Sequence, residues 1–234
     1  MNAILLSAGF GKRLLPFTKT KPKCLINIYK KENLLELWLE KLHKLNVKKV
    51  VINTHYKKDL ISSYLKKSKY KKKIEISYEK KILGTAGTLI KHKKLLKNDD
   101  LILVHSDNYC EENLELFLKA HINRPKNCLM TMLTFRTKKP ENCGIVKVDK
   151  NNIVKEFFEK KKIKKGNLAN GAIYILSKEI YPELTKKKYL DFSNEVIPRY
   201  INKILTYETN SYFIDIGTPQ SLKKIRKYLY EKNT

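Results

Sequence analysis

The 234 residues suit one ordinary α/β domain or two small ones, and 42% hydrophobic residues can fill a core, which excludes a disordered chain. No run of about 18 apolar residues is present, and no basic residue precedes the short apolar N-terminal stretch, so we predict no transmembrane helix, no signal peptide and a cytoplasmic location. The net charge of +27 is compatible with nucleic-acid binding, but only five basic residues are arginines, which are best suited to bidentate phosphate and base contacts, so we expect no specific nucleic-acid partner.

The first half of the chain alternates predicted strands with predicted helices. Apolar or β-branched runs predict strands, and apolar residues at helical spacing predict amphipathic helices. The predicted strands are 3–7, 49–54, 74–78 and 101–104, and the predicted helices are 34–45, 59–66 and 85–96. This order indicates an α/β fold with a mostly parallel sheet, whose ligands belong at the carboxyl ends of the strands.

After about residue 125 strands with short connections dominate. The predicted strands are 129–135, 144–148, 153–158, 171–176, 204–207 and 212–216, and the predicted helices are 194–201 and 219–231. No long linker or internal repeat interrupts the chain. We therefore predict one domain, 1–234, with a mostly parallel, mixed central sheet flanked by helices, a nucleotide-binding half at about 1–125 and an acceptor half at about 126–234.

The cysteines and histidines indicate no metal site. Four cysteines lie far apart without a CxxC pair, and the five histidines show no HExxH spacing. Reduced thiols are the expectation for this pattern.

A glycine-containing loop follows the first predicted strand. Gly9 and Gly11 would let backbone N–H groups approach phosphate oxygens, and Arg13 and Lys23 add positive charge nearby. The loop is neither a P-loop nor a dinucleotide fingerprint, because it lacks GxxxxGK[ST] and a third glycine opening a helix. A GxG pair alone would also fit a tight turn.

The segment 7–25, SAGFGKRLLPFTKTKPKCL, strongly resembles the signature of the sugar-1-phosphate nucleotidyltransferases. Five further matches follow in order along essentially the full chain: EKKILGTAG at 79–87, SDN at 106–108, FEK at 158–160, NG at 170–171 and DIGTP at 215–219. The chain departs from the family pattern at His105, at Lys161 and in the order of Asn170-Gly171-Ala172. These departures affect fine positioning rather than the activity that the resemblance implies.

The resemblance implies a Rossmann-like nucleotidyltransferase fold, an NTP and a sugar 1-phosphate as substrates, and Mg²⁺ as cofactor. The implied catalytic residues are Arg13, Lys23, Asp107 and Asp215, and both aspartates are the implied metal ligands. The implied nucleotide-binding residues are Leu6, Ser7, Ala8, Gly9, Gly11, Lys12, Arg13, Lys23, Gly84, Thr85 and Ala86. The implied sugar-phosphate-binding residues are Asn108, Gly144, Glu159, Lys160, Asn170 and Gly171.

These residue types suit the implied reaction. Two anionic substrates must meet despite their repulsion, and phosphoryl-type transfer needs positioning and charge neutralisation more than a covalent group. Arg13 and the glycine loop would hold the leaving pyrophosphate, Lys23 would stabilise the α-phosphoryl group, and Lys160 would bind the acceptor phosphate. Mg²⁺ favours one or two carboxylates with substrate oxygens and water, which Asp107 and Asp215 would provide.

Simpler roles remain open for single residues and for the chain. Asp107 could cap a following helix, Asp215 could be a turn residue, Glu159 and Lys160 could be an exposed pair, and 83–87 could be a helix start without a ligand. A non-catalytic nucleotide-binding relative and a nucleic-acid-binding protein are the alternatives of another class.

The loop 83–87, LGTAG, resembles that of mannose- and heptose-1-phosphate guanylyltransferases more than the glutamine-bearing loop of thymidylyl and uridylyl enzymes. Small residues there leave room for a purine. We predict GTP with a mannose- or heptose-1-phosphate, giving a GDP-sugar for polysaccharide synthesis, with a thymidylyl- or uridylyltransferase of glucose-type 1-phosphates as the alternative. We also expect a minimal transferase domain without a C-terminal β-helix, and predict nothing about oligomeric state.

Overall fold

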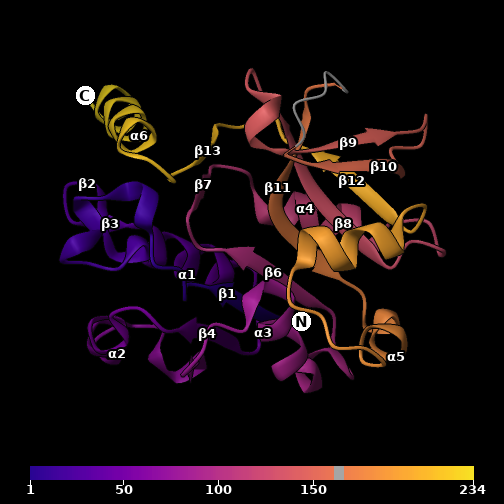
Figure 1. Ribbon diagram of the computed structural model, residues 1–234, viewed down its shortest axis with the longest axis horizontal. Coiled ribbons are helices and arrows are strands. Elements are labelled where there is room, and N and C mark those ends of the chain that lie inside the picture. The colour runs from indigo at the N-terminus through magenta and orange to yellow at the C-terminus, as the bar shows by residue number, and fades with distance from the viewer. Residues whose placement is uncertain (161–165) are drawn as a thin grey trace. The chain divides into compact units, whose positions relative to one another are not determined.

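The computed structural model describes residues 1–160 and 166–234, so Lys161 lies outside the described residues. Figure 1 shows the helices and strands of the chain. The chain divides into two compact units. Unit 1 comprises Met1–Asn2, Leu83–Val104 and Glu112–Ser211, and unit 2 comprises Ala3–Ile82, His105–Glu111 and Tyr212–Thr234. Each unit draws on both halves of the chain, whereas the predicted division followed chain order at about residue 125.

Unit 2 is built around three parallel strands. β1 (Asn2–Leu6) pairs with β4 (Val50–Thr54), and β4 pairs with β5 (Ile74–Tyr78). All five β4 residues are buried, as a continuous apolar run predicts for a parallel strand covered on both faces. Crossover helices α1 (Leu34–Lys44) and α2 (Lys58–Lys66) connect the strands in the order that the sequence predicts.

Helix α1 shows why these residues form a helix. Asn33 caps it by accepting a hydrogen bond from the Glu36 N–H, and the buried side chains recur at helical spacing: Leu34, Leu35, Trp38, Leu39 and Leu42. The Trp38 indole Nε1 donates to the backbone oxygen of Asn108 at 2.8 Å. Helix α1 therefore supports the backbone next to one of the predicted metal aspartates.

A second part of unit 2 joins distant segments. β7 (Asn108–Cys110) pairs antiparallel with β13 (Phe213–Asp215), opposing Asn108 to Asp215. Helix α6 (Pro219–Lys232) begins with a capping box between Thr218 and Ser221. It packs on a core cluster made of Leu14, Ile26, Ile28, Leu34, Tyr109, Ile216, Leu222, Ile225 and Leu229. The sequence did not predict β7 or the hairpin of β2 (Asn27–Tyr29) and β3 (Glu32–Asn33).

Unit 1 is more antiparallel. β11 (Leu168–Leu176) pairs antiparallel with β6 (Leu101–His105), β8 (Met130–Arg136) and β9 (Gly144–Val148). β10 (Val154–Glu159) pairs antiparallel with β9, and β12 (Ile204–Glu208) runs parallel to β8. The helices of this unit are α3 (Gly84–Lys91), α4 (Leu114–Ile122) and α5 (Tyr181–Leu184).

The predicted fold class, a mixed, mostly parallel α/β sheet flanked by helices, is confirmed. Two predicted helices differ in detail. The helix expected at 85–96 is α3 followed by a 3₁₀ turn at Lys93–Leu96. The helix expected at 194–201 is a π turn, Phe192–Val196, followed by a 3₁₀ turn, Ile197–Tyr200, because Pro198 has no N–H to continue an α-helix.

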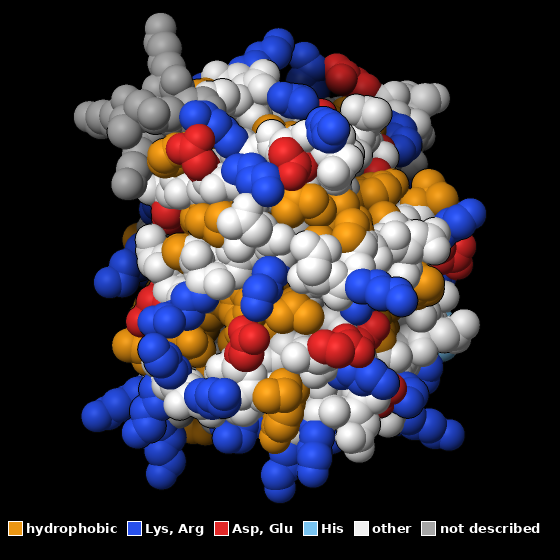
Figure 2. All heavy atoms as spheres, turned by 90° about the vertical axis from the view of Figure 1, so that its right-hand side faces the viewer, with side chains coloured by type: hydrophobic (Ala, Val, Ile, Leu, Met, Phe, Trp, Pro, Cys, Tyr) orange, Lys and Arg blue, Asp and Glu red, His pale blue; other side chains and the backbone are white. Residues whose placement is uncertain are grey.

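Basic side chains are spread over the one face of the molecule that Figure 2 shows. There, Lys and Arg side chains are interspersed with acidic and hydrophobic ones rather than joined in one stripe. No helix in 1–160 and 166–234 is both long and apolar enough to cross a bilayer.

Candidate active site

Polar side chains at the ends of the unit 2 strands fix the start of the glycine loop. The Ser7 N–H donates to Asn53 Oδ1 at 2.6 Å, and Asn53 Nδ2 donates to Glu79 Oε1 at 3.0 Å. The Ser7 hydroxyl donates to Ser106 Oγ at 2.9 Å, and that hydroxyl donates to the Leu6 oxygen at 2.8 Å. Sequence reasoning missed Asn53, although its place at the end of a buried strand was a usable signal.

The two loop glycines differ in their surroundings. Gly11 has φ +65°, and a Cβ there would lie 2.7 Å from Cγ2 of Thr18, a residue 1% exposed whose hydroxyl donates to the Gly11 oxygen. A Cβ on Gly9 would meet no heavy atom within 4 Å. Backbone conformation and packing therefore require glycine at position 11, while position 9 leaves open space above the backbone.

Aromatic side chains flank the same loop. Phe10 packs edge-on against His55, with ring centroids 5.2 Å apart, and lies 5.8 Å from the Tyr56 ring. The Tyr56 hydroxyl donates to the Thr18 oxygen at 2.9 Å. Sequence reasoning assigned no role to His55 or Tyr56, yet both support the loop.

Lys23 lies between two carboxylates. Its Nζ is 2.6 Å from Asp107 Oδ2 and 3.4 Å from Asp215 Oδ1, and its side chain is 13% exposed. The residue opens a 3₁₀ turn, Lys23–Leu25, that follows the extended Pro22, and Cys24 and Leu25 are buried. Local backbone structure thus fixes the base of the side chain and directs the ammonium group to the aspartates.

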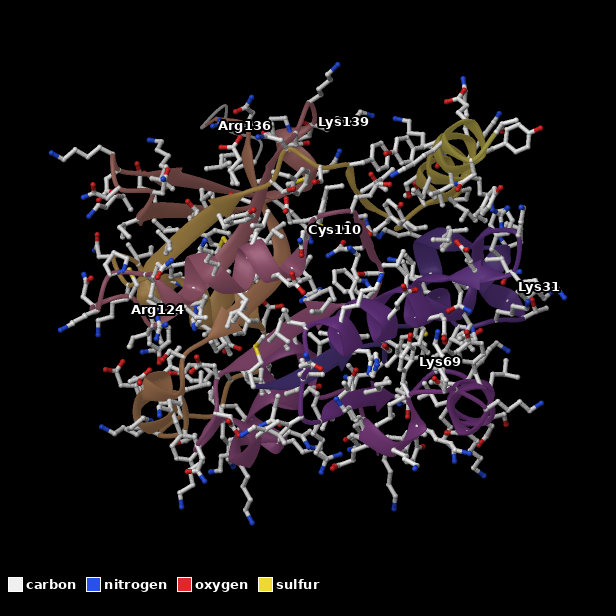
Figure 3. All side chains as sticks on the ribbon, turned by 180° about the vertical axis from the view of Figure 1, so that it is seen from behind. Lys31, Lys69, Cys110, Arg124, Arg136 and Lys139 are labelled. Carbon is white, nitrogen blue, oxygen red and sulfur yellow. The ribbon has the colours of Figure 1, made fainter. Side chains whose placement is uncertain are left out.

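The pairing of β7 with β13 brings the two aspartates to one place, although they are far apart in sequence. Cys110, the last residue of β7, is labelled in Figure 3. The Ile216 N–H donates to the Asp107 oxygen at 3.0 Å, continuing the ladder past Asp215. Arg13 Nη2 is 3.9 Å from Asp215 Oδ2.

The electrostatics of the two carboxyls differ. Removal from water opposes ionisation of Asp107, but Lys23 and His105 outweigh it and lower the pKa of that carboxyl. Removal from water and the neighbouring Asp107 charge raise the pKa of Asp215, against the opposing effect of Lys23 and Arg13. The cluster therefore has two neighbouring carboxylates whose mutual repulsion is offset by cations.

Asp107 does not cap the following helix, which was the alternative role that the sequence left open. The cap of α4 is Asn113, whose side chain accepts the Glu115 N–H, whereas the Asp107 carboxylate pairs with Lys23. The described residues hold no group of three or more His, Cys, Asp or Glu side chains arranged for a metal ion. Two carboxylates sharing one cation nevertheless fit Mg²⁺, which commonly takes one or two protein carboxylates and completes its shell with phosphate oxygens and water.

The predicted base-binding loop forms the start of α3 in unit 1. Gly84 has φ +78°, and a Cβ there would overlap the Leu190 oxygen, so close backbone approach requires glycine. Thr85 Oγ1 accepts the Phe192 N–H at 2.8 Å, and the Ala86 N–H donates to the Leu190 oxygen at 3.0 Å. The Ala86 amide is thus already hydrogen-bonded within the unit.

Five of the six predicted sugar-phosphate residues lie in unit 1, in two groups. Gly144 faces Glu159 across the β9–β10 pair, and a Cβ there would lie 2.7 Å from Glu159 Oε2; Lys160 Nζ is 3.2 Å from Glu159 Oε1. Asn170, on β11 beside Gly171, donates from Nδ2 to the Tyr174 hydroxyl at 2.7 Å. Asn108 lies in unit 2, mostly buried beside Asp107.

The structure therefore brings Arg13, Lys23, Asp107 and Asp215 together within unit 2, and Gly144, Glu159 and Lys160 together within unit 1. A sequence model described as nucleotidyl transferase matches residues 2–232. The chain belongs to the nucleotidyl transferase family. This confirms the family that the six ordered motifs predicted, within its sugar-1-phosphate branch.

The names of two relatives of this nucleotidyl transferase state a sugar 1-phosphate substrate. It is 34% identical over 223 residues to D-glycero-alpha-D-manno-heptose 1-phosphate guanylyltransferase of Campylobacter jejuni, covering 94% of this chain and 96% of the relative. It is 29% identical to mannose-1-phosphate guanyltransferase 2 of Candida glabrata, covering 94% of this chain and 62% of that relative. It spans 55% of the length of the bifunctional protein GlmU of Methanocaldococcus jannaschii, with 31% identity over 99% of this chain.

Solved structures share the fold of this transferase. HddC from Yersinia pseudotuberculosis, complexed with GMP-PN, has a TM-score of 0.79 at 24% identity, covering 97% of this chain and 99% of that one. An apo UDP-glucose pyrophosphorylase has a TM-score of 0.81 at 18% identity, covering 100% of both chains. At these identities the likeness establishes the fold and leaves the substrate open.

Proposed function

We propose that the protein transfers a guanylyl group from GTP to a heptose- or mannose-type sugar 1-phosphate, forming a GDP-sugar for polysaccharide synthesis and releasing pyrophosphate. The observation that carries the choice of substrates is the 34% identity to a heptose 1-phosphate guanylyltransferase over nearly the whole of both chains. The cluster of Arg13, Lys23, Asp107 and Asp215 supports transfer chemistry, because it places cations and carboxylates together.

The glycine loop and Arg13 bind the triphosphate in this proposal. The open space above Gly9 admits phosphate oxygens to the backbone N–H groups, and the Arg13 guanidinium, whose side chain is 71% exposed, is accessible to the β- and γ-phosphates. Hydrogen bonds from Ser7 hold the loop in place before substrate arrives. The other residues that the family resemblance assigns to the nucleotide are Leu6, Ala8 and Lys12 in unit 2 and, for the base and ribose, Gly84, Thr85 and Ala86 in unit 1.

Lys23 acts on the reacting phosphorus. An oxygen of the sugar phosphate attacks the α-phosphorus in line, a new P–O bond forms, and the bond to pyrophosphate breaks. Negative charge on the equatorial oxygens is stabilised by the Lys23 ammonium, a contact strongest in the transition state. No protein group has to become covalently attached.

Asp107 and Asp215 hold Mg²⁺ in this proposal. An ion held by these two residues would supply charge neutralisation and help to orient phosphate groups. Asp107 is suited to bind it because its lowered pKa keeps it ionised. Asp215, whose side chain is 51% exposed, is accessible to a ligand from solvent.

The sugar phosphate binds through the unit 1 residues. Lys160, whose side chain is 62% exposed, pairs with the acceptor phosphate. The Glu159 carboxylate accepts hydrogen bonds from sugar hydroxyls, and the Asn170 amide donates to a sugar oxygen or accepts from a sugar hydroxyl. Gly144 and Gly171 shape the space around them, and Asn108, in unit 2, is the remaining residue that the resemblance assigns to the sugar phosphate. Lys160 is a point charge free to reorient from its contact with Glu159.

Pyrophosphate release from five nucleoside triphosphates, each tested against a panel of sugar 1-phosphates, tests the proposal. We expect the highest kcat/KM with GTP and a heptose or mannose 1-phosphate. Equal or better turnover of UTP or dTTP with glucose 1-phosphate would overturn the proposed substrate specificity but not the proposed nucleotidyl transfer. No turnover with any pair, together with sequence-specific polynucleotide binding of steep salt dependence, would favour the nucleic-acid alternative instead.

A further inference from the structure

The Lys23 ammonium lies where it contacts both carboxylates that the proposed function assigns to Mg²⁺. Its Nζ is 2.6 Å from Asp107 Oδ2 and 3.4 Å from Asp215 Oδ1. One cation in contact with two like charges offsets their repulsion, which is also the electrostatic effect of a shared metal ion. Lys23 and a divalent cation therefore compete for the same oxygens.

Lys23 cannot give up these partners without a replacement. Its side chain is 13% exposed, so water replaces little of the lost interaction, and an unpaired ammonium in such surroundings is unfavourable. The backbone gives it little freedom, because the Leu25 N–H donates to the Pro22 oxygen and the Ile26 N–H to the Lys23 oxygen. Movement of Lys23 is therefore limited to its own side chain.

We propose that Lys23 is an internal cation that Mg²⁺ displaces from Asp107 and Asp215, and that a triphosphate favours this exchange by giving the released ammonium a new anionic partner. The inference rests on the proposed function for the identity of that triphosphate. Metal and nucleotide then bind with positive coupling, and by linkage each tightens the other by the same factor. The free protein binds Mg²⁺ weakly, and the metal becomes tightly held once the nucleotide is bound.

The charges of the four side chains predict how removing the Lys23 charge changes the affinity for Mg²⁺. At neutral pH Arg13 and Lys23 balance Asp107 and Asp215, so an incoming divalent cation meets no net negative charge. Lys23→Gln leaves a net negative cluster and removes the competitor. Because a unit charge at about 4 Å still interacts strongly with a divalent cation at an effective dielectric constant of about 20, we expect Mg²⁺ to bind this variant at least about tenfold more tightly.

Calorimetric titration of MgCl₂ into the free protein at pH 8 measures this directly. We expect a lower Kd for Lys23→Gln than for wild type, and a wild-type-like Kd for Lys23→Arg, which keeps the charge. Lys31→Gln removes the same charge from the turn between β2 and β3, where the exposed, labelled side chain points outward in Figure 3, and should leave the Kd unchanged. Equal Mg²⁺ affinity of Lys23→Gln and wild type would overturn the proposal.

A measurement on the unmodified protein covers the case in which Lys23→Gln does not fold. Amine-reactive labelling followed by peptide mass spectrometry reports the reactivity of Lys23, with Lys31 as the internal reference. We expect labelling of Lys23 to rise several-fold with saturating Mg²⁺ and to fall again when a non-hydrolysable GTP analogue is added. Lys23 reactivity that does not respond to Mg²⁺ would contradict displacement.

These results are separable from the proposed function. If no pair of NTP and sugar 1-phosphate gives pyrophosphate, the proposed function fails, while the Mg²⁺ titration still decides whether Lys23 competes with the metal. If turnover is as proposed but Mg²⁺ affinity is the same with and without the Lys23 charge, only the displacement fails.

Discussion

Gly9 and Gly11 belong to one loop, yet replacing each by alanine should have opposite consequences. A Cβ at Gly11 would lie 2.7 Å from a methyl carbon of Thr18, and φ +65° is unfavourable for any L-residue with a side chain. A Cβ at Gly9 would meet nothing within 4 Å, and its φ lies outside the left-handed region. Gly11→Ala should therefore perturb folding, whereas Gly9→Ala should perturb the binding of a ligand to the loop.

The magnitudes follow from these contacts. The left-handed conformation costs alanine roughly 1 kcal/mol or more, and the crowded Thr18 methyl adds about 1 kcal/mol or more, since the buried hydroxyl of that residue is already bonded to the Gly11 oxygen. Gly11→Ala should therefore destabilise the fold by about 2 kcal/mol and lower Tm by roughly 4–8 °C. Gly9→Ala should leave Tm unchanged or raise it slightly, because alanine restricts the unfolded chain.

Activity should separate the variants in the opposite sense. A methyl group on Gly9 occupies the space through which phosphate oxygens reach the backbone, so Gly9→Ala should lower kcat/KM for the triphosphate by about tenfold or more. Differential scanning calorimetry and steady-state kinetics of both variants provide the two readouts. Gly9→Ala with wild-type kcat/KM would refute the phosphate-binding role of this loop, and Gly11→Ala with wild-type Tm would refute the steric argument.

Three further predictions concern the charged groups. Asp107→Asn and Asp215→Asn should fold normally but lose about 10²-fold or more in kcat, and EDTA should abolish turnover of wild type; an active Asp215→Asn enzyme or full activity in EDTA would contradict the metal assignment. Lys23→Ala should chiefly lower kcat, whereas Lys160→Ala should chiefly raise KM for the sugar phosphate, and the reverse partition in steady-state kinetics would exchange their roles. Burial, only partly opposed by Asp100, lowers the pKa of His121 below its usual 6.5, so the unfolded chain takes up this proton first and stability should fall as pH drops below about 6.5. Urea unfolding at several pH values should show that slope in wild type and a shallower one in His121→Gln, and an identical slope would exclude His121 as its source.

Much of the fold was predictable because its signals are local. β5 has the predicted bounds, and β1, β4, α1 and α6 begin and end within about a residue of prediction, since each is a continuous apolar run or a periodic helix with a clear cap. β7 was missed because three residues, NYC, carry too little pattern, and their strand exists only through pairing with β13 more than 100 residues away. Tertiary context decides such elements.

In the candidate active site, too, local sequence signals predicted some features and missed others. Motifs identified Arg13, Lys23, Asp107 and Asp215, but residue types alone gave no indication that the Lys23 ammonium would contact both aspartates. The support of the loop by Asn53, Tyr56 and Thr18 was likewise not predicted, because each contact joins segments from different elements. Motifs and their spacing identify candidate site residues, whereas the hydrogen-bond and ion-pair partners of these residues depend on the folded geometry.

The most direct test of guanylyl transfer to a sugar 1-phosphate is ³¹P NMR of the purified protein with GTP, MgCl₂ and a heptose or mannose 1-phosphate. The account predicts that the signals of a GDP-sugar and of pyrophosphate appear together in equal amounts, at the expense of both substrates, and that Asp107→Asn gives almost none. Pyrophosphate or phosphate that forms at the same rate without the sugar 1-phosphate, or no new diester signal after prolonged incubation, would contradict it.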